Sequence, residues 1–203
     1  MAVHPETNGK PGFTLMNPKK TGVTFANVLQ GDAYLTNAVA HNGTGVAIGD
    51  VDGDGWQDIY LCSLQGPNRL YRNLGHWRFE EMELGDAACA EQLSTGATFA
   101  DVDGDGDLDL LVNGIAAGTR LFLNDGKGKF SAPKEFKTAS GNYGVTLCDL
   151  DRDGKLDVVT ANYRDRSISV LKGVGDGTFH SANTTPKGQR RQDGKWLSEI
   201  RSP

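Results

Sequence analysis

The chain has 203 residues, a formal net charge of −5 at neutral pH, and 37% hydrophobic against 23% charged residues, which is typical of a soluble globular protein and excludes overall disorder. No apolar run approaches the roughly 18 residues of a membrane span, and the N-terminus lacks the basic and apolar regions of a signal peptide. The three cysteines have no C-x-x-C spacing and predict no disulfide framework. Basic residues are scattered, so nothing indicates a nucleic-acid groove.

An acidic nine-residue pattern, D-x-D-x-D-x-x-x-D with Gly at position 6, occurs three times and sets the period of the chain. The copies begin at Asp50, Asp101 and Asp149, so they are spaced by 51 and 48 residues. The sequence around each copy repeats as well. Each repeat therefore indicates one structural unit.

Each unit contains four strand-like segments rich in Val, Ile, Leu, Phe and Tyr. The first precedes the acidic loop, the second follows it directly, and a Gly-containing turn joins the third and fourth. The expected ranges are 45–49, 96–100 and 144–148 for the first strand, 59–62, 110–113 and 158–161 for the second, and 69–72, 120–123 and 168–171 for the third, with the fourth beginning at Phe79, Phe130 and Phe179. Four short antiparallel strands per roughly 50 residues predict the blades of an all-β propeller.

The period divides the chain into five parts. Residues 1–44 form an N-terminal segment with possible edge or closing strands, and three blades are expected at 45–95, 96–143 and 144–182. Residues 183–203 lose the period and are polar and basic, which predicts a poorly ordered tail. The fold class is therefore a partial β-propeller of about three to four blades.

The acidic loops predict calcium sites, because calcium takes six to eight oxygen ligands in flexible geometry whereas magnesium demands a tighter octahedron. Positions 1, 3, 5 and 9 would supply carboxylates and position 7 a backbone carbonyl. The predicted ligands are Asp50, Asp52, Asp54, Trp56 and Asp58; Asp101, Asp103, Asp105, Asp107 and Asp109; and Asp149, Asp151, Asp153, Lys155 and Asp157, with Trp56, Asp107 and Lys155 acting through the carbonyl. The side chain of Asp107 should therefore be replaceable.

Two alternatives to a structural calcium loop are less consistent with this pattern. An EF-hand needs Glu at position 12, where the three loops hold Leu61, Val112 and Thr160. A catalytic metal would need a general base, and no His or Glu lies within the loops. We therefore expect three structural Ca²⁺ sites and no catalytic residues.

The chain resembles the FG-GAP and VCBS repeat family, the blades of integrin α-chain-like propellers, over roughly residues 45–182. The resemblance is carried by the three acidic loops, by Asn-Arg-Leu-Tyr-Arg-Asn-Leu-Gly at 68–75 and by Gly-Asp-Gly-Thr-Phe at 175–179. Phe130–Pro133 is similar to the family's Phe-Gly…Gly-Ala-Pro signature. Residues 22–27 and the Asn-Arg-Leu-Tyr-Arg-Asn run at 68–73 look most like bacterial members that carry an ASPIC/UnbV region. The resemblance implies a ring of about seven blades, so additional blades or self-association would be needed to close it.

The expected function is a non-catalytic, calcium-stabilised module for adhesion or recognition of an extracellular protein or glycan. The resemblance implies a ligand face opposite the calcium loops, where Tyr143, Tyr163, Arg164 and Arg166 are suitable anchors. The alternatives are a fragment of a propeller enzyme, which would need a carboxylate such as Glu91, Glu135 or Asp165 in a pocket, a lectin-like carbohydrate-binding domain, or a scaffold fragment without activity of its own. Weak loops suit millimolar calcium, so an extracellular, periplasmic or cell-surface setting is expected although no signal peptide is recognised in this chain.

Overall fold

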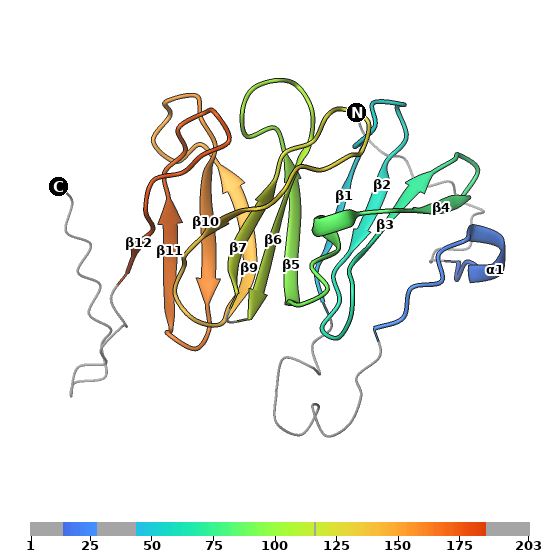
Figure 1. Ribbon diagram of the computed structural model, residues 1–203, viewed down its shortest axis with the longest axis horizontal. Helices are drawn as coiled ribbons and strands as arrows, with labels where there is room; N and C mark the ends of the chain where they lie inside the picture. Colours follow the sequence, from blue (N-terminus) through green and yellow to red (C-terminus); the bar gives the residue numbers. More distant parts are fainter. Residues whose placement is uncertain (1–13, 28–43, 116, 186–203) are drawn as a thin grey trace, which may run out of the picture.

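The computed structural model describes residues 14–27, 44–115 and 117–185. Within these residues, three four-stranded antiparallel sheets stand in a row (Figure 1). The first contains β1 (Val46–Gly49), β2 (Asp58–Leu61), β3 (Arg69–Asn73) and β4 (Phe79–Met82); the second contains β5 (Leu93–Ala100), β6 (Asp109–Ile115), β7 (Gly118–Phe122) and β8 (Lys134–Phe136); and the third contains β9 (Asn142–Cys148), β10 (Asp157–Asn162), β11 (Ser167–Leu171) and β12 (Asn183–Thr184). Each sheet is a simple meander in chain order, as a propeller blade requires.

The predicted all-β fold is confirmed, and the first three strands of each blade lie where the sequence places them. The fourth strands of the second and third blades begin later than expected, at Lys134 and Asn183 instead of Phe130 and Phe179. The two phenylalanines instead form isolated bridges that close the preceding turn, Phe130 to Asn124 and Phe179 to Gly173. In the second blade Pro133 follows, and proline cannot donate to the sheet. No single residue explains the later start in the third blade.

The first strands of the three blades lie beside one another, because glycine lets their backbones approach closely. A Cβ on Gly45 would lie 2.6 Å from the Cα of Gly96, and a Cβ on Gly96 would lie 3.2 Å from the carbonyl oxygen of Tyr143. Glycine at these two positions therefore allows the first strands of neighbouring blades to pack closely. All three acidic loops, which join the first and second strands, lie along one edge of the row of sheets (Figure 1).

The hydrophobic core lies between the blades. Alternation along β6 divides its side chains between two clusters, since successive residues of a strand point to opposite faces. Leu110 and Val112 pack with the first blade, whereas Leu111 packs with Val158 of the third. All four side chains are at most 1% exposed. The middle blade thus packs on both faces, against the first blade and against the third.

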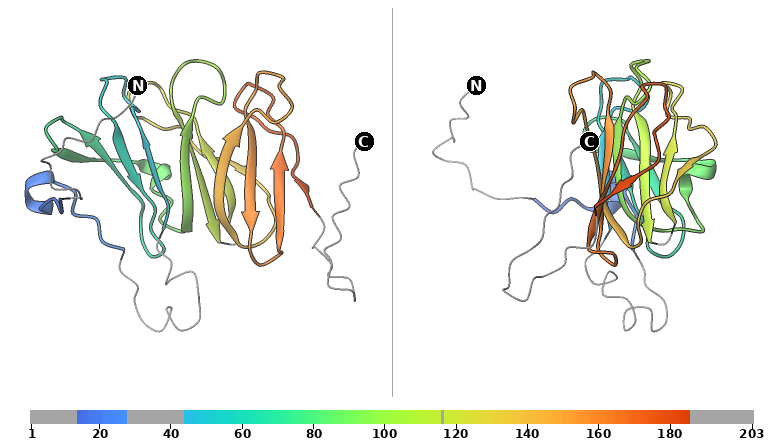
Figure 2. Two further views of the ribbon diagram at one scale, coloured as in Figure 1. Left: turned by 180° about the vertical axis from the view of Figure 1, so that it is seen from behind. Right: turned by 90° about the vertical axis from the view of Figure 1, so that its left-hand side faces the viewer.

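The N-terminal segment contributes a short helix, α1 (Pro18–Thr21), and no strand within residues 14–27. Asn17 caps the helix through a hydrogen bond from the N–H of Lys19, and Gly22 ends it with a φ of 84°. A Cβ on Gly22 would lie 2.2 Å from the carbonyl oxygen of Phe79, so this turn rests against β4, as Figure 2 shows from behind. Possible strands at 28–43 and the tail from 186 onward lie outside the described residues; residues 183–184, assigned to the tail by sequence, pair with β11.

Within the parts of the chain that the structure describes, no helix is long and apolar enough to cross a membrane.

Candidate metal centres in the acidic loops

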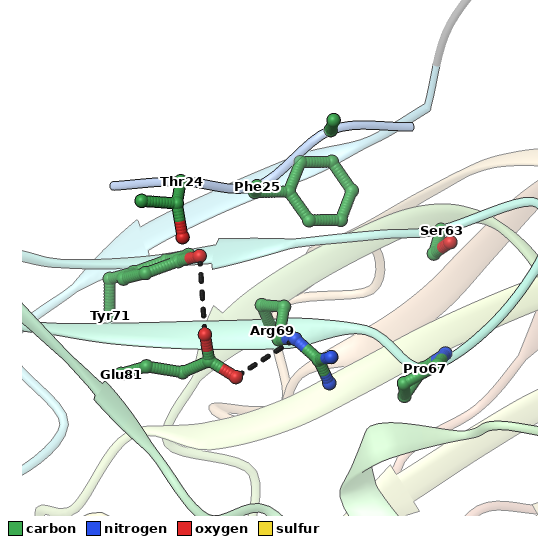
Figure 3. Close-up of a pocket in the computed structure, with 8 residues that line it drawn as sticks. Thr24, Phe25, Ser63, Pro67, Arg69, Tyr71 and Glu81 are labelled. Atoms are coloured by element: carbon green, nitrogen blue, oxygen red, sulfur yellow. Dashed lines mark hydrogen bonds and ion pairs between the residues drawn. The ribbon is translucent and has the colours of Figure 1, made fainter. Parts of the chain in front are cut away.

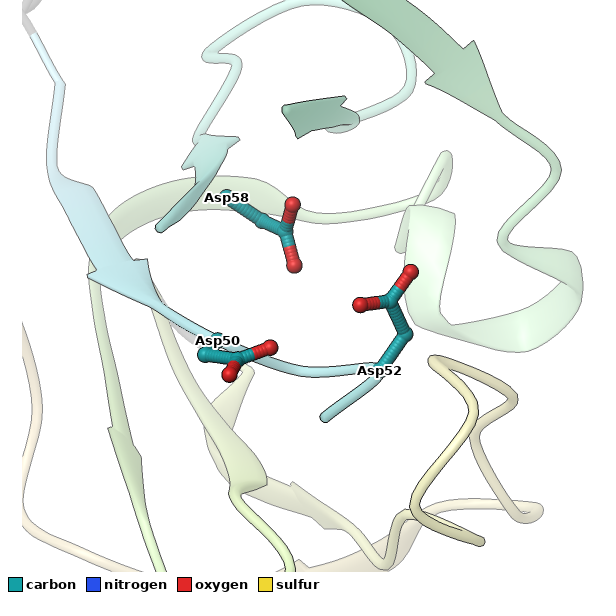
Figure 4. Close-up of side chains that lie close together, drawn as sticks. All are labelled: Asp50, Asp52 and Asp58. Atoms are coloured by element: carbon teal, nitrogen blue, oxygen red, sulfur yellow. The ribbon is translucent and has the colours of Figure 1, made fainter. Parts of the chain in front are cut away.

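Each acidic loop brings three predicted ligands together, at positions 1, 3 and 9. One carboxylate oxygen from each member of a trio lies within 4.8 Å of the others. In the first loop the three side chains point toward one another across the hairpin (Figure 4). The trios are Asp50, Asp52 and Asp58; Asp101, Asp103 and Asp109; and Asp149, Asp151 and Asp157. The repeat in sequence is therefore a repeat in geometry.

The aspartate at position 9 is the buried member of each trio and accepts the same two backbone hydrogen bonds. In the second loop Asp109 is fully buried; its Oδ2 accepts from the N–H of Val102 at 3.0 Å, and its Oδ1 accepts from the N–H of Asn124 at 2.9 Å. Asp58 and Asp157 make the equivalent pairs of bonds. This carboxylate thus ties the acidic loop to the turn between the third and fourth strands, a role that sequence alone did not indicate.

Position 1 holds the loop in its turn. Asp50 accepts hydrogen bonds from the N–H groups of Asp54 and Gly55 at 3.1 and 2.9 Å. Asp149 accepts from the same two positions of its loop, whereas Asp101 accepts from positions 4 and 6, Gly104 and Gly106. Gly55 has a φ of 90°, in the left-handed region that favours glycine. Gly106 and Gly154 also have a positive φ, so the backbone favours glycine at position 6 of all three loops.

Positions 5 and 7 differ from the trio. In each loop Oδ1 of the position-5 aspartate accepts from the N–H of position 7, at 2.9 Å for Asp105 and Asp107. The position-7 side chains lie over a glycine of the neighbouring turn: a Cβ on Gly75 would be 3.3 Å from the Trp56 ring, and one on Gly126 would be 2.6 Å from Oδ2 of Asp107. Lys155 lies over Gly175 in the same manner. The carbonyl role of position 7, and metal binding by position 5, stay predictions.

Two of the loops contact a side-chain cation. In the first, Arg72 forms ion pairs with Asp52 and Asp54, the latter with Nη2 and Oδ2 3.0 Å apart. In the third, Lys172 forms ion pairs with Asp151 and Asp153, the latter at 3.2 Å. Both cations come from beyond the loop, so the sequence pattern of the loop did not identify them.

Burial is the main influence on the pKa of two of the position-9 aspartates. Burial raises the pKa of Asp109 to about 6; the N–H groups of Asn124 and Val102 oppose the rise, and the carboxylates of Asp103 and Asp105 add to it. Burial also raises the pKa of Asp58. In the third loop, desolvation raises the pKa of Asp153, but the hydrogen bonds from the Lys172 ammonium and the Lys155 N–H, together with the charges of both lysines, lower it overall. At Asp153 a neighbouring cation thus favours the ionised carboxylate.

The donor set also fits calcium. All the side-chain donors are carboxylate oxygens, and hard oxygen ligands suit Ca²⁺ and Mg²⁺ over the softer transition metals. Asp58, Asp109 and Asp157 are at most 2% exposed, and a buried carboxylate beside others is costly unless a positive charge compensates it. The residues present therefore fit the predicted ion.

At the opposite end of the third blade, two of the residues expected at the ligand face meet. The rings of Tyr143 and Tyr163 have centroids 5.1 Å apart, tilted by 54°. Tyr163 is 67% exposed. The next residue, Arg164, packs over Gly141, where a Cβ would lie 2.7 Å from its Cγ. Arg166 lies in the same turn with a φ of 49°.

A pocket of about 200 Å³ lies elsewhere, where the N-terminal segment meets the first blade (Figure 3). Its lining includes Phe25, Arg69, Tyr71 and Glu81. Glu81 joins the other two polar side chains: Oε1 is 2.9 Å from Nε of Arg69, and the Tyr71 hydroxyl donates to Oε2 at 3.4 Å. The carboxylate of Glu81 is therefore already bonded to the Arg69 guanidinium and the Tyr71 hydroxyl.

The carboxylates proposed for an enzymatic alternative do not line this pocket. Glu135 forms an ion pair with Arg120 at 2.9 Å, and Asp165 accepts from the N–H of Ser140 at 2.7 Å. Glu91 is exposed.

Comparison with known proteins places these loops in a described repeat. The model of the FG-GAP-like repeat matches residues 50–112 and 101–160, together more than half of the chain. Cartilage acidic protein 1 of Xenopus tropicalis is 29% identical over 167 residues, covering 75% of this chain and 26% of that protein. The Mus musculus protein of the same name is 31% identical over 138 residues, covering 63% and 21%. This chain thus spans about a quarter or less of the length of these relatives.

Among solved structures, an Agrocybe aegerita lectin that specifically recognises non-reducing terminal N-acetylglucosamine superposes with a TM-score of 0.48 at 23% identity, over 68% of this chain and 37% of that one. The repeat match, the three blades and the three equivalent acidic hairpins agree with one another. The chain belongs to the FG-GAP-like repeat family.

Proposed function

We propose that this chain is a non-catalytic, calcium-stabilised part of a β-propeller that recognises a protein or glycan ligand outside the cell. The observation that carries the proposal is the threefold recurrence of one oxygen-only carboxylate trio, always at the first hairpin of a blade. A single acidic turn is commonly solvated and needs no metal. Three copies with the same buried anchor are better explained by a shared ion requirement.

The ions would act on the fold. Each trio joins the start of an acidic loop to its end, and the position-9 aspartate also holds the next turn of the same blade. Calcium bound there would neutralise the repulsion among these carboxylates and hold the hairpin closed. No His, Cys or Glu belongs to the three trios, which favours a structural ion over a catalytic one.

The ligand face would lie at the opposite end of the blades, away from the metal. The Tyr143 and Tyr163 pair, with Arg164 beside it, combines rigid aromatic area with a planar cation. Tyrosine and arginine are the residues that most often anchor interfaces, and aromatic rings also pack against sugar rings. This end of the third blade is therefore our candidate for ligand contact.

The outer faces of the row would be covered by further blades or by another copy. Val46 and Ile48 on β1 are 51% and 61% exposed, and Ile168 on β11 is 46% exposed. An extracellular setting is supported by the name of the cartilage relatives and by the millimolar calcium concentration that weak loops require.

Two measurements test this proposal. Isothermal titration calorimetry with CaCl₂ should give three ions per chain, and magnesium at the same concentration should bind more weakly. The chain, in the presence of calcium, should then bind a ligand on an array of glycans and purified extracellular matrix proteins. Binding should fall in Tyr163→Ala. It should not fall in the control variant Arg120→Leu, which changes a residue of β7. No calcium uptake would refute the metal part, and a ligand indifferent to Tyr163→Ala would refute the assignment of the face.

A further inference from the structure

The three acidic loops share one pattern but differ in the charges around them. The pairing between the second and third strands identifies an equivalent position in each blade. Position 10, the first residue after the acidic loop, pairs with a residue of the third strand, and the position of interest is the residue that follows this partner. Position 10 pairs with Tyr71, Phe122 and Leu171 in the three blades. The residues that follow these partners are Arg72, Leu123 and Lys172.

At this position the first and third blades have a cation that contacts the acidic loop, and the middle blade has none. Arg72 and Lys172 each pair with the carboxylates at positions 3 and 5 of their own loop. Leu123 has no charge and can make no such pair, so Asp103 and Asp105 of the middle loop lack this neutralisation. The two outer loops thus carry an internal counter-ion on the oxygens expected to face calcium.

The residues inside the loops also make the local formal charge differ between the three blades. Position 4 is Gly, Gly and Arg, and position 7 is Trp, Asp and Lys, in chain order. With the tethered cations included, the first loop has four carboxylates and one cation, a local formal charge of −3. The second has five carboxylates and no cation, a charge of −5. The third has four carboxylates and three cations, a charge of −1, with Arg152, Lys155 and Lys172 as the cations.

We propose that these side-chain cations rank the three calcium sites, with the second loop binding most tightly, the first next and the third most weakly. The ranking rests on the proposed calcium binding. A divalent ion entering the first or third loop must share its carboxylates with a guanidinium or ammonium group, or displace it. The middle loop presents its full negative charge to the ion alone.

The same cations would keep the outer loops closed when calcium is low. Arg72 holds Asp52 beside Asp54 without a metal, whereas Asp103 and Asp105 depend on the ion for neutralisation. The middle blade, which both core clusters share, would therefore be the one whose acidic loop responds at the lowest calcium concentration. The chain would sense calcium through the blade on which the other two pack.

The first experiment measures each loop alone. In three variants of the full chain, the position-3 and position-5 aspartates of two loops are changed to Asn, which keeps hydrogen-bond acceptors and leaves one loop intact. Calorimetric titration with CaCl₂ at fixed ionic strength should give dissociation constants that increase from the second to the first to the third loop, by about tenfold at each step. Equal constants, or a different order, would overturn the ranking.

The second experiment exchanges the cations. Arg72→Leu should tighten the first loop and Leu123→Arg should weaken the second, each by about tenfold, and the effects should shrink in high salt. Arg69→Leu is the matched control, since it removes the same charge from the same strand but from a residue paired with Glu81. It should change calcium affinity by less than about twofold, because exposed charges away from the ion are screened.

Terbium luminescence gives an independent reading in the unmodified loops. Trp56 lies in the first loop and is half-exposed, so terbium bound there would be sensitised by its indole ring. Arg72→Leu should shift this titration to lower terbium concentration. An unchanged or weaker titration would mean that Arg72 orients the ligands instead of competing, and would overturn the proposal; failure of all three loops to bind any ion would instead refute the proposed function itself.

Discussion

Chelation of calcium should lower the melting temperature of this chain, and the size of the shift follows from the free energy of calcium binding at the three loops. A site held at ten times its dissociation constant contributes about 1.4 kcal/mol to the free energy of unfolding. If the weakest of the three sites is held at this level, the three together contribute at least about 4 kcal/mol, a large share of the 5–15 kcal/mol typical of a folded domain. A change of 1 kcal/mol shifts the melting temperature by about 2–4 °C in a chain of this size, so EDTA should lower it by about 8–16 °C.

Differential scanning calorimetry in CaCl₂ and in EDTA measures this shift, with magnesium at matched ionic strength as the control. A variant carrying Asn at Asp52, Asp103 and Asp151 removes one carboxylate from each trio and should melt at nearly the same temperature in both buffers. A wild-type melting temperature that EDTA leaves unchanged within about 2 °C would refute the reasoning, because it would mean that the buried trios fold equally well without an ion.

Three further predictions concern the fold that carries the loops. Gly106→Ala should cost about 1 kcal/mol, because its φ of 96° is strained for an L-residue although open space surrounds it; Gly144→Ala, also in open space but without a positive φ, should be neutral in the same urea titration. Asn124→Ala should cost about 1–3 kcal/mol, because its buried Nδ2 donates to carbonyls of two blades. Asn73→Ala should cost less, because the two side-chain bonds it loses, to the carbonyl of Gln57 and from the N–H of Gly75, are exposed or only partly buried. Burial and the neighbouring Cys89 thiol raise the pKa of Cys62 to about 12 in the folded chain. The unfolded chain loses this proton at lower pH, so the free energy of unfolding should fall as pH rises from about 9 to 12. In Cys62→Ala this fall should be shallower by up to about 1.4 kcal/mol per pH unit.

The strands and acidic loops could be predicted from sequence because their signals are local and occur three times. Short runs of strand-forming residues identify the second and third strands of each blade, and the spacing of the aspartates places positions 1, 3 and 9 across one hairpin. The match in three copies removes the ambiguity that a single Asp/Gly turn would have. What the repeat pattern predicts best is therefore what each blade does within itself.

Contacts between separate parts of the chain could not be predicted in this way. Arg72 lies 18 residues from Asp54, and Asn124 lies 73 residues from the carbonyl of Val51 that it binds. Neither residue has a counterpart of the same type in all three blades, so the repeat offered no signal for them. The late fourth strands were missed for a related reason: Phe130 and Phe179 are strong strand formers, but the bridges they make across the turn belong to the hairpin closure and not to the sheet.

The two roles of the position-9 aspartate limit what chelation can do. Its carboxylate accepts two backbone N–H groups whether or not an ion is present, so the link between the acidic loop and the next turn does not depend on calcium alone. Positions 3 and 5 have fewer such bonds and stay partly exposed. Removing calcium should therefore increase hydrogen exchange first at the N–H groups of positions 4 to 7, while the N–H groups of Val102 and Asn124 remain protected until the blade unfolds. Uniform loss of protection across the whole hairpin would mean that the ion, and not the aspartate, holds the blade together at this edge.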